Sequence, residues 1–253
     1  MNQDDRVLGT GHRWLQRHAV AGIRPFPREL LRAAARAERE QCRRAQYTAD
    51  ALRALSLSNS SGAKKVVLLV RHGEALHNQD WRTHRDTRDP ELTERGAAQA
   101  QGLADNPALL RRTLIVCSPM SRAIQTAAAI FGERPACRTC LCALHTERCS
   151  GGAPCNFGSP KAELVRRFPF VASWEGFDDL ADGQWWPDPS DEAHDRWKTR
   201  RVPAFLAWLQ RQPESRIVVV GHGAFFHDPR LAGRMLSNCE VAVCLLSDST
   251  PRD

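Results

Sequence analysis

Two apolar segments of the chain end in nearly the same way, in a histidine followed by a glycine. Residues 65–70 (KVVLLV) precede Arg71-His72-Gly73, and residues 216–220 (RIVVV) precede Gly221-His222-Gly223. Short β-branched apolar runs are typical of strands buried on both faces, as in a parallel sheet. Ligands of such folds bind beyond the carboxyl ends of the strands. The two segments therefore predict an α/β fold with two histidines at its binding edge.

Strand and helix patterns alternate through the rest of the chain after residue 64. Further strands are expected at residues 113–117, 138–144 and 239–246, and helices at residues 93–103, 118–131 and 191–212. Thr93 is the expected cap of the first helix, and Ser118-Pro119 the expected start of the second. The alternation predicts a three-layer α/β/α domain with a mainly parallel central sheet. Residues 145–190, rich in Gly, Pro and aromatic residues, are expected to form an irregular insertion with one short helix near 161–168.

The positive charge of the chain is concentrated near its start. The 253 residues carry a net charge of +7, and residues 1–65 hold 13 basic and 6 acidic side chains. Residues 28–57 suit one or two helices, and residues 58–62 (SNSSG) indicate a linker. We interpret residues 1–63 as an Arg-rich extension, partly helical or disordered, before a catalytic domain at 64–253. Such an extension can bind RNA, anionic lipid or an organelle import receptor, but arginine is frequent throughout the chain, and no nucleic-acid partner is expected.

Few features of the sequence indicate a compartment. Asp4 and Asp5 lie where a secretory signal would be positive, and no apolar segment follows them. The longest apolar runs are about five residues, against roughly 18 for a membrane span, so no span is expected. Nine cysteines without a signal peptide suit free thiols and a cytoplasmic location, with organellar targeting by the extension as the alternative.

Three of the cysteines have a spacing that could suggest zinc, in the pattern Cys137-x-x-Cys140-x-Cys142. Cys140 and Cys142 alternate with Leu141 in a predicted strand, however, and no second pair of closely spaced cysteines follows. Cysteine is also a common small buried residue. We therefore favour structural thiols over a metal site.

Side chains suited to phosphoryl transfer follow the predicted strands. Arg71 and His72 follow the first, Arg122 the second, Glu147 the third and His222 the fourth. A guanidinium group matches phosphate oxygens, and a neutral histidine can act as a covalent nucleophile. A carboxyl group can protonate the departing alkoxide. Together at one edge of a sheet, these residues predict a site for phosphoryl transfer.

Five blocks of the sequence carry a resemblance to a known family. They are LLVRHGEALHN at 68–78, LTERGAAQA at 92–100, CSPMSRAIQTA at 117–127, ER at 147–148 and VVVGHGAFF at 218–226. In order and spacing they resemble the histidine phosphatase superfamily, also called phosphoglycerate mutase-like. The resemblance covers about residues 64–246.

The resemblance implies a role for each matching residue. His72 is implied as the nucleophile that becomes phosphohistidine. Arg71, Arg122 and His222 are implied to line the phosphate pocket and to stabilise the transferring phosphoryl group. No metal or other cofactor is expected, because arginine and histidine cations supply the positive charge.

Four further residues have roles implied by the resemblance. Asn78 and Gly223 are expected to contact the phosphate. Glu147 is implied as the acid that protonates the leaving group and then activates water, with Glu74 as the alternative donor. We favour Glu147, because Glu74 belongs to a block in which this position is more often structural.

Three functions remain open from the sequence. We favour a phosphomonoesterase acting on a small phosphorylated metabolite. A mutase must also keep its phosphoenzyme from water and return the phosphoryl group to a bound intermediate, which hydrolysis does not require. Residues 147–170 lack the aromatic and paired basic pattern of the family's mutases. A phosphomutase is the first alternative, and a weakly active or inactive phosphate-binding domain is the second. An oligomer is possible.

Some residues near these blocks are expected to be structural. Trp185 and Trp186 are expected to pack the insertion onto the sheet rather than to line the substrate pocket. The arginines of residues 82–88 are expected to form a solvated loop, balanced by Asp86 and Asp89. The remaining histidines are expected to be ordinary, and His145 is of interest because it lies two residues before Glu147.

Overall fold

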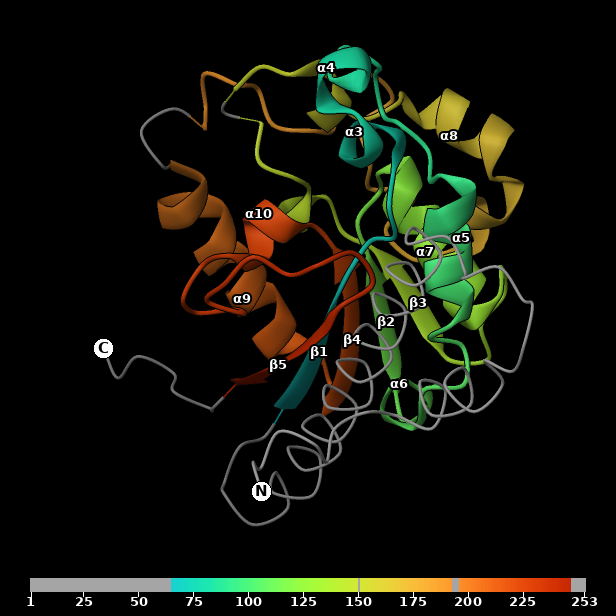
Figure 1. Cartoon of the computed structure of the whole chain (residues 1–253). Helices are drawn as coiled ribbons and strands as arrows, with labels where there is room; N and C mark the ends of the chain where they lie inside the picture. The colour runs from blue at the N-terminus through green and yellow to red at the C-terminus, as the bar shows by residue number, and fades with distance from the viewer. Residues whose placement is uncertain (1–64, 150, 193–195, 247–253) are drawn as a thin grey trace, which may run out of the picture. The chain divides into compact units, whose positions relative to one another are not determined.

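The strands form one five-stranded sheet (Figure 1) in the computed structural model, which describes residues 65–149, 151–192 and 196–246. Its strands are β1 (Lys65–Arg71), β2 (Leu114–Cys117), β3 (Arg138–Leu141), β4 (Arg216–Gly221) and β5 (Val241–Leu246). Their order is β3-β2-β4-β1-β5. The first four strands in this order are parallel, and β5 pairs antiparallel with β1 at the edge. The mainly parallel sheet is as predicted, while the extension at 1–63 lies outside the described residues.

Both faces of the sheet are buried, which explains the unbroken apolar runs. In β1, Val66, Leu68 and Val70 belong to one hydrophobic core, and Val67 and Leu69 belong to the other. All five side chains are 3% exposed or less. Burying each such side chain contributes about 1.5–3 kcal/mol to stability. The central strands are therefore firmly held, and so are the residues that follow their carboxyl ends.

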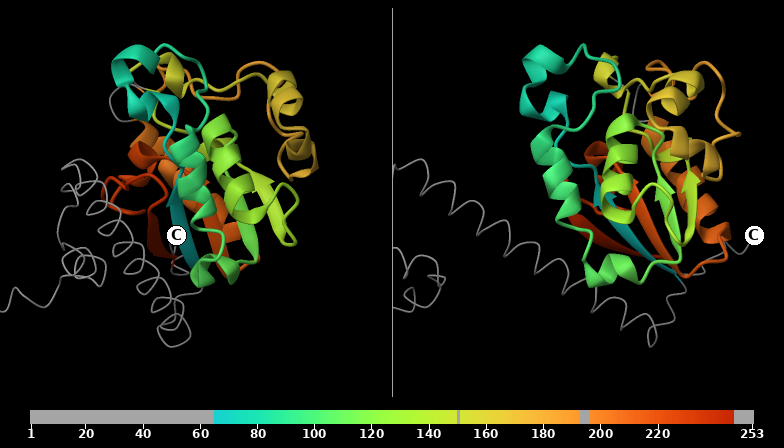
Figure 2. Two further views of the ribbon diagram at one scale, coloured as in Figure 1. Left: turned by 45° about the vertical axis from the view of Figure 1, so that its right-hand side comes forward. Right: turned by 90° about the vertical axis from the view of Figure 1, so that its right-hand side faces the viewer.

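Helices cover each face of the sheet (Figure 2). On one face lie α5 (Glu94–Gln101), α6 (Pro107–Leu110), α7 (Ser121–Phe131) and α8 (Lys161–Arg167), which contribute apolar residues to the first core. On the other face lie a π-helical turn (Trp197–Arg201), α9 (Val202–Arg211) and α10 (Gly223–Phe226), which contribute to the second. This arrangement confirms the three-layer α/β/α fold. No helix in the described part of the chain is both long enough and apolar enough to cross a membrane.

Short helical elements lie beyond the carboxyl ends of the parallel strands. They include α3 (Leu76–Gln79) and α4 (Trp81–His84), which follow β1 (Figure 1). The insertion adds three turns of 3-10 helix, Ala143–His145, Pro154–Asn156 and Pro169–Ser173, together with α8. Of these, Pro154–Asn156 lies at the carboxyl ends of the parallel strands, where its Cys155 carbonyl accepts from Arg122, whereas Pro169–Ser173 leads into residues that run beside β3.

Helix α7 begins later than the sequence predicts. Ser118 is not its cap, and Met120, the residue before the helix, makes no side-chain capping bond. A residue distant in sequence does this instead, because Asp89 accepts hydrogen bonds from Ser121 N (2.9 Å) and Ser121 Oγ (2.6 Å). A carboxylate at a helix N-terminus satisfies unpaired amides and complements the helix dipole. The cap was not predictable from local sequence, because it is supplied from another loop.

The predicted long helix at 191–212 is also shorter than expected. Its described part is the π-helical turn followed by α9, and Pro203 lies in the first turn of α9. Proline has no amide hydrogen, so it is tolerated at a helix start but interrupts a helix interior. The expected strand at 239–246 begins at Val241, because Cys239 has a φ of +56°.

The block LTERGAAQA supports the turn that follows His72. Thr93 caps α5 as predicted, since its Oγ1 accepts from Gly96 N at 3.0 Å. A Cβ on Gly73 would lie 2.4 Å from the Gly96 carbonyl oxygen, so the two backbones pack directly against each other. Gln99 Oε1 accepts from the amide of Glu74 at 2.9 Å. Helix α5 therefore holds the backbone immediately after the histidine in place.

Candidate functional site

His72 is a fully buried, neutral histidine, and one of its ring nitrogens has no hydrogen-bond partner among the described residues. It directly follows β1, and its Nδ1–H donates to the Gly73 carbonyl at 2.7 Å. Nε2 therefore carries the lone pair, and it is buried without a hydrogen-bond partner among the described residues. Burial, followed by the charges of Arg122 and Arg71, holds the pKa of His72 well below its ordinary value. A neutral imidazole with a fixed tautomer and an unused Nε2 is the form that a nucleophile requires.

His222 lies beside His72, with the ring centroids 5.3 Å apart. Its Nε2 forms a 2.8 Å hydrogen bond with Ser118 Oγ, and its Nδ1 is buried without a partner among the described residues. Burial and the nearby Arg122 charge lower the pKa of His222 as well. Ser118, expected to cap a helix, instead orients this second histidine.

Two arginines at this edge have buried donors that are not used. Arg71 Nη1 donates to the Leu236 carbonyl at 2.6 Å, and its Nε is unpartnered. Arg122 is 0% exposed, and it donates through Nη1 to the Cys155 carbonyl at 2.9 Å. Its Nε and Nη2 have no partner in the described part of the chain. Buried donors are rarely left unpaired, so two arginines with buried, unpartnered N–H groups indicate an anion-binding site.

Glu147 is the carboxylate that faces these arginines. It follows the turn Ala143–His145, and its Oε1 accepts from the Arg148 amide at 2.9 Å. Its charge interacts with those of both Arg71 and Arg122. The structure thus brings Glu147 to the edge where the sequence predicts it.

Glu74, the alternative proton donor, is held elsewhere. Its carboxylate accepts from Thr93 Oγ1 at 2.9 Å and pairs with Arg95 at 3.2 Å. It lines a different cavity, with Thr93, Glu94 and Arg95. This geometry agrees with a structural role for Glu74.

A pocket of about 510 Å³ opens at this edge. The side chains that line it come from the loop after β1, the insertion and the loop after β4: Arg71, His77, Asn78, Trp81, Arg85, Glu147, Arg148, Gly151, Ala153, Asn156, Ala224 and Met235. The pocket therefore brings together three segments that are distant in sequence. A pocket of this kind, with convergent polar groups, is a common form of binding site for a small molecule.

Asn78 and Gly223, both expected at the phosphate, contribute in different ways. Asn78 lines the pocket and accepts from Ala75 N at 3.1 Å and Asn238 Nδ2 at 3.3 Å. Gly223 is buried beside Arg71, and a Cβ there would lie 3.0 Å from Arg71 Nε. Glycine at this position leaves room for the guanidinium group.

His77 was not predicted as a site residue. Its ring centroid lies 6.0 Å from that of His72, and burial together with the two arginines lowers its pKa to about 3. It therefore adds no positive charge near neutral pH. Its place in the first sequence block, next to Asn78, was the one signal that could have identified it.

A buried ion pair holds the segment around Glu147. Arg201 Nη1 donates to the carbonyls of Leu144 (3.2 Å) and Thr146 (3.0 Å), and Nη2 donates to the Glu147 carbonyl (3.4 Å). Arg201 also pairs with Glu192, which is 2% exposed and accepts from the amide of Cys149. One ion pair therefore fixes the backbone on both sides of Glu147. This pair could not be predicted from the sequence, because neither residue belongs to a recognisable block.

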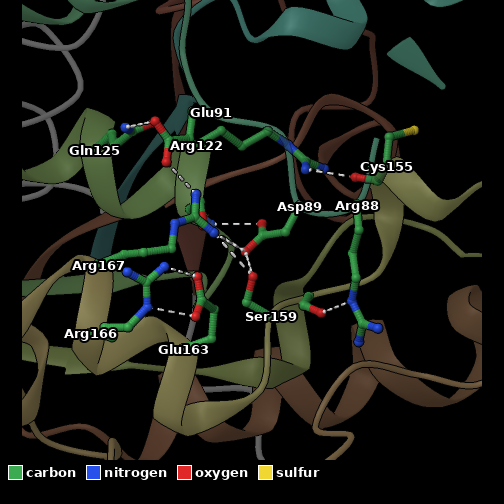
Figure 3. A network of polar contacts seen from close by, with 12 residues as sticks. Arg88, Asp89, Glu91, Arg122, Gln125, Cys155, Ser159, Glu163, Arg166 and Arg167 are labelled. Carbon is green, nitrogen blue, oxygen red and sulfur yellow. Dashed lines mark hydrogen bonds and ion pairs between the residues drawn. The ribbon is translucent and has the colours of Figure 1, made fainter. Parts of the chain in front are cut away.

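The insertion is fastened to the core by a polar network centred on Asp89 (Figure 3). Asp89 is 1% exposed, and besides Ser121 it accepts from Ser159 Oγ at 2.8 Å and approaches Arg167 Nη1 at 3.6 Å. Arg167 also pairs with Glu91 at 2.6 Å. The expectation that Asp89 balances a solvated arginine is therefore wrong, because this carboxylate is buried and joins the loop after α4 to α7 and α8.

The two tryptophans of the insertion pack differently: Trp185 lies against the first core, as expected, whereas Trp186 belongs to neither core. Trp185 Nε1 donates to the Ser159 carbonyl at 2.8 Å. The Arg88 guanidinium lies 4.4 Å from the centre of a Trp186 ring, and Arg88 Nε donates to the Gly158 carbonyl at 2.8 Å. Neither tryptophan lines the pocket described above.

Cys140 and Cys142 are buried thiols of the sheet region. Both belong to the second core, whereas Leu141 between them belongs to the first. Burial raises the pKa of Cys140 to about 11 and that of Cys142 to about 12. No group of three or more His, Cys, Asp and Glu side chains in the described residues is arranged to hold a metal ion. This packing on opposite faces agrees with the alternation of Cys140, Leu141 and Cys142 in the predicted strand.

His145 is a structural histidine behind the site. Its ring stacks on Phe205 with the centroids 4.7 Å apart, and its Nε2–H donates to the Val220 carbonyl at 3.2 Å. Burial lowers its pKa to about 3. It therefore stays neutral in the folded protein where an exposed histidine would gain a proton.

This buried histidine should make the protein less stable in mild acid. Below about pH 6.5 the unfolded state binds a proton that the folded state does not bind until about pH 3. Proton uptake by His145 in the unfolded state costs no stability above pH 6.5, and its cost grows as the pH falls. Between pH 7 and pH 5 it should lower the free energy of unfolding by about 2 kcal/mol.

Urea denaturation of the wild type, His145→Gln and the control His84→Gln at both pH values tests this expectation. The variant His145→Gln should lose less stability between pH 7 and pH 5 than the wild type and the control, which should behave alike. Equal pH dependence in all three proteins would contradict it.

Comparison with known proteins finds several that are similar to this chain. A protein of Arabidopsis thaliana described as a phosphoglycerate mutase-like protein is 27% identical over 199 residues, which are 64% of this chain and 72% of that protein. The structure of the ecdysone phosphate phosphatase from Bombix mori in complex with tungstate is 16% identical, with a TM-score of 0.48, and the similarity covers 71% of this chain and 88% of that one. A phosphoserine phosphatase from Entamoeba histolytica in complex with 3-phosphoglyceric acid is 22% identical, with a TM-score of 0.43, covering 71% and 89%.

The family model of the histidine phosphatase superfamily (branch 1) matches residues 67–227. The match includes His72 and His222, Arg71 and Arg122, and Glu147. Because it spans more than half of the chain, it confirms the resemblance seen in the sequence blocks: this chain belongs to branch 1 of the histidine phosphatase superfamily.

Proposed function

We propose that this chain is a phosphomonoesterase that hydrolyses a small phosphorylated substrate through a phosphohistidine at His72. One observation carries the proposal. His72 is neutral and buried, with an unpartnered Nε2 beside the unused donors of Arg71 and Arg122. A nucleophile next to a preformed anion site is what phosphoryl transfer requires.

In the first step, the lone pair on His72 Nε2 attacks phosphorus and the ester P–O bond breaks. The departing alkoxide takes a proton from the Glu147 carboxyl group. Arg71, Arg122 and His222 stabilise the charge on the phosphoryl oxygens during transfer. The Gly73 carbonyl accepts from Nδ1–H at 2.7 Å, so it stabilises the imidazolium-like phosphohistidine.

In the second step, water attacks phosphorus and the N–P bond breaks. The Glu147 carboxylate accepts the proton from the water, and the lone pair returns to His72 Nε2. Inorganic phosphate leaves, and both groups regain their starting protonation states. One carboxyl group therefore serves first as acid and then as base.

Hydrolysis of an aryl phosphate by the full-length chain tests the proposal, with release of phosphate and of the phenol both measured. Equal amounts of the two products are expected in water. Phenol release that depends on an added alcohol or phosphorylated acceptor, with the phosphoryl group found on that acceptor, would indicate a mutase. Binding of phosphate without turnover would indicate the inactive alternative.

Arg201 should act as a positioning residue for Glu147, because its guanidinium group binds the carbonyls of Leu144, Thr146 and Glu147. Arg201→Lys keeps the charge but cannot make all of these bonds. It should slow alkyl phosphates, which need the proton from Glu147, by roughly 10- to 100-fold, because small misplacements of a catalytic group are costly.

The same variant should change the phosphorylation of His72 by a nitrophenyl phosphate much less, because that leaving group needs little protonation. Arg200→Lys, an exposed neighbour, is the control. A purely structural role for Arg201 would instead slow both classes of ester equally.

Residues 1–62 should be dispensable for the chemistry, because all the residues proposed above lie between 71 and 222. A chain that begins at Ala63 should fold and keep the kcat/KM of the full chain toward an aryl phosphate. A folded but inactive shortened chain would contradict this. The cytoplasmic location and an oligomeric state stay predictions.

A further inference from the structure

The candidate active-site pocket is larger than a phosphoryl group needs. Its volume is about 510 Å³, and one end adjoins His72 through Arg71 and His77. The outer part of its lining contains Arg85, Arg148 and the indole ring of Trp81. This outer part is available to the organic group of a substrate.

The outer part carries more positive charge than the pocket itself neutralises. Arg85 has an exposed ion pair with Asp86 at 3.5 Å, a kind of contact that contributes little. The Arg148 guanidinium lies 6.0 Å from the centre of a Trp197 ring. Glu147 is the one carboxylate among the described residues that line this pocket, and its charge interacts with those of Arg71 and Arg122 at the phosphate end. Two cations therefore remain for a second negative group.

One turn of 3-10 helix, Pro154–Asn156, connects these two arginines to the phosphate end. Its Cys155 carbonyl accepts from Arg122 Nη1 at 2.9 Å, and the amide of the same residue donates to the Arg85 carbonyl at 3.0 Å. Asn156 Nδ2 donates to the Arg148 carbonyl at 3.0 Å. The backbones of Arg85 and Arg148 are thus both joined through this turn to the buried guanidinium group of Arg122.

Trp81 supplies an apolar surface in the same pocket. Its side chain is 48% exposed, and its ring meets that of His77 edge-on at 6.3 Å. A large exposed indole in a pocket gains by covering its face with carbon. The pocket lining therefore combines an arginine beside His72, an apolar wall and a second group of cations.

We propose that the substrate is a phosphomonoester whose organic group carries a second anionic group, bound by Arg85 and Arg148. This inference rests on the proposed function. Either a carboxylate or a second phosphate has the required chemistry, since both accept charge-assisted hydrogen bonds from guanidinium groups.

Binding of three phosphonates to the full-length chain, measured by calorimetry, tests the subsite without catalysis. Benzylphosphonate has one anionic group, 4-carboxybenzylphosphonate adds a carboxylate, and 1,4-xylylenediphosphonate adds a second phosphonate. We expect the better of the two doubly anionic compounds to bind at least tenfold more tightly than benzylphosphonate. Which of them does so distinguishes a carboxylate from a second phosphate.

Arg85→Gln and Arg148→Gln should each reduce that preference several-fold, and the double variant should bring it close to one. Arg211→Gln removes an exposed charge at the end of α9 and should leave the preference as in the wild type. A preference near one in the wild type, or a preference unchanged in the double variant, would overturn the subsite.

Hydrolysis of the matching phosphate esters, benzyl phosphate and its 4-carboxy and 4-phosphooxymethyl analogues, separates the subsite from the chemistry. We expect the same order of preference in kcat/KM, because the three leaving groups are similar. Selective binding of the phosphonates without hydrolysis of any ester would support the subsite and overturn the proposed function. Hydrolysis of all three esters at equal kcat/KM would overturn the subsite and leave the proposed function intact.

Discussion

Replacing His72 with alanine should abolish formation of a phosphoenzyme and lower turnover of an aryl phosphate by a factor on the order of 10⁴ or more, as expected when a nucleophile is removed. The reason is geometric. Nε2 of His72 carries no hydrogen-bond partner among the described residues. Burial lowers the pKa of the imidazole, which is close enough to Arg122 and Arg71 for their charges to lower this pKa further. His222 is held differently, because its Nε2 is hydrogen-bonded to Ser118 Oγ.

The measurement is rapid mixing with a labelled aryl phosphate, followed by a quench in alkali, where phosphohistidine survives. His227→Ala is the matched control, because His227 is an exposed histidine at the end of α10. It should label like the wild type. His72→Asn provides a second variant that keeps a side-chain donor toward the Gly73 carbonyl, should His72→Ala fold poorly. Stoichiometric labelling of either folded His72 variant would reject the mechanism.

The fold, and the gathering of His72, His222 and Arg71 at the carboxyl ends of the parallel strands, were predictable because each depends on a local pattern. The runs KVVLLV and RIVVV are continuous and apolar, which requires a strand covered on both faces. Once those strands are parallel, Arg71, His72 and His222 must lie at the same edge of the sheet. Glu147 was harder to identify, because it follows an irregular turn rather than a strand end.

The residues that hold the site residues in position were not predictable, because their roles come from contacts between distant segments. Asp89 caps α7 from a loop that precedes it by 32 positions, and Ser118 orients a histidine 104 positions away. Glu192 and Arg201 hold Glu147 from the far side of the insertion. Each is an ordinary polar residue in sequence, and its role depends on tertiary structure alone.

Replacing Glu147 with glutamine should slow the hydrolysis of alkyl phosphates by about 10²- to 10⁴-fold, the usual contribution of a general acid. Glutamine keeps the shape of the side chain and an oxygen to accept from the Arg148 amide, but it cannot donate a proton to an alkoxide. A nitrophenyl leaving group departs without protonation, so phosphorylation of His72 by that ester should change little.

The second step should then become limiting, because the same carboxylate is proposed to activate water. Glu147→Gln should therefore show a burst of one nitrophenol per active site, followed by slow turnover as phosphohistidine accumulates. Glu74→Gln is the control, since Glu74 is held by Thr93 Oγ1 and Arg95 in a different cavity and should affect both esters alike. Equal slowing of alkyl and aryl esters by Glu147→Gln would contradict the assignment. A loss confined to alkyl esters in Glu74→Gln would move the proton donor to Glu74, and the Glu74 carboxylate would then have to leave its two present partners to reach the leaving group.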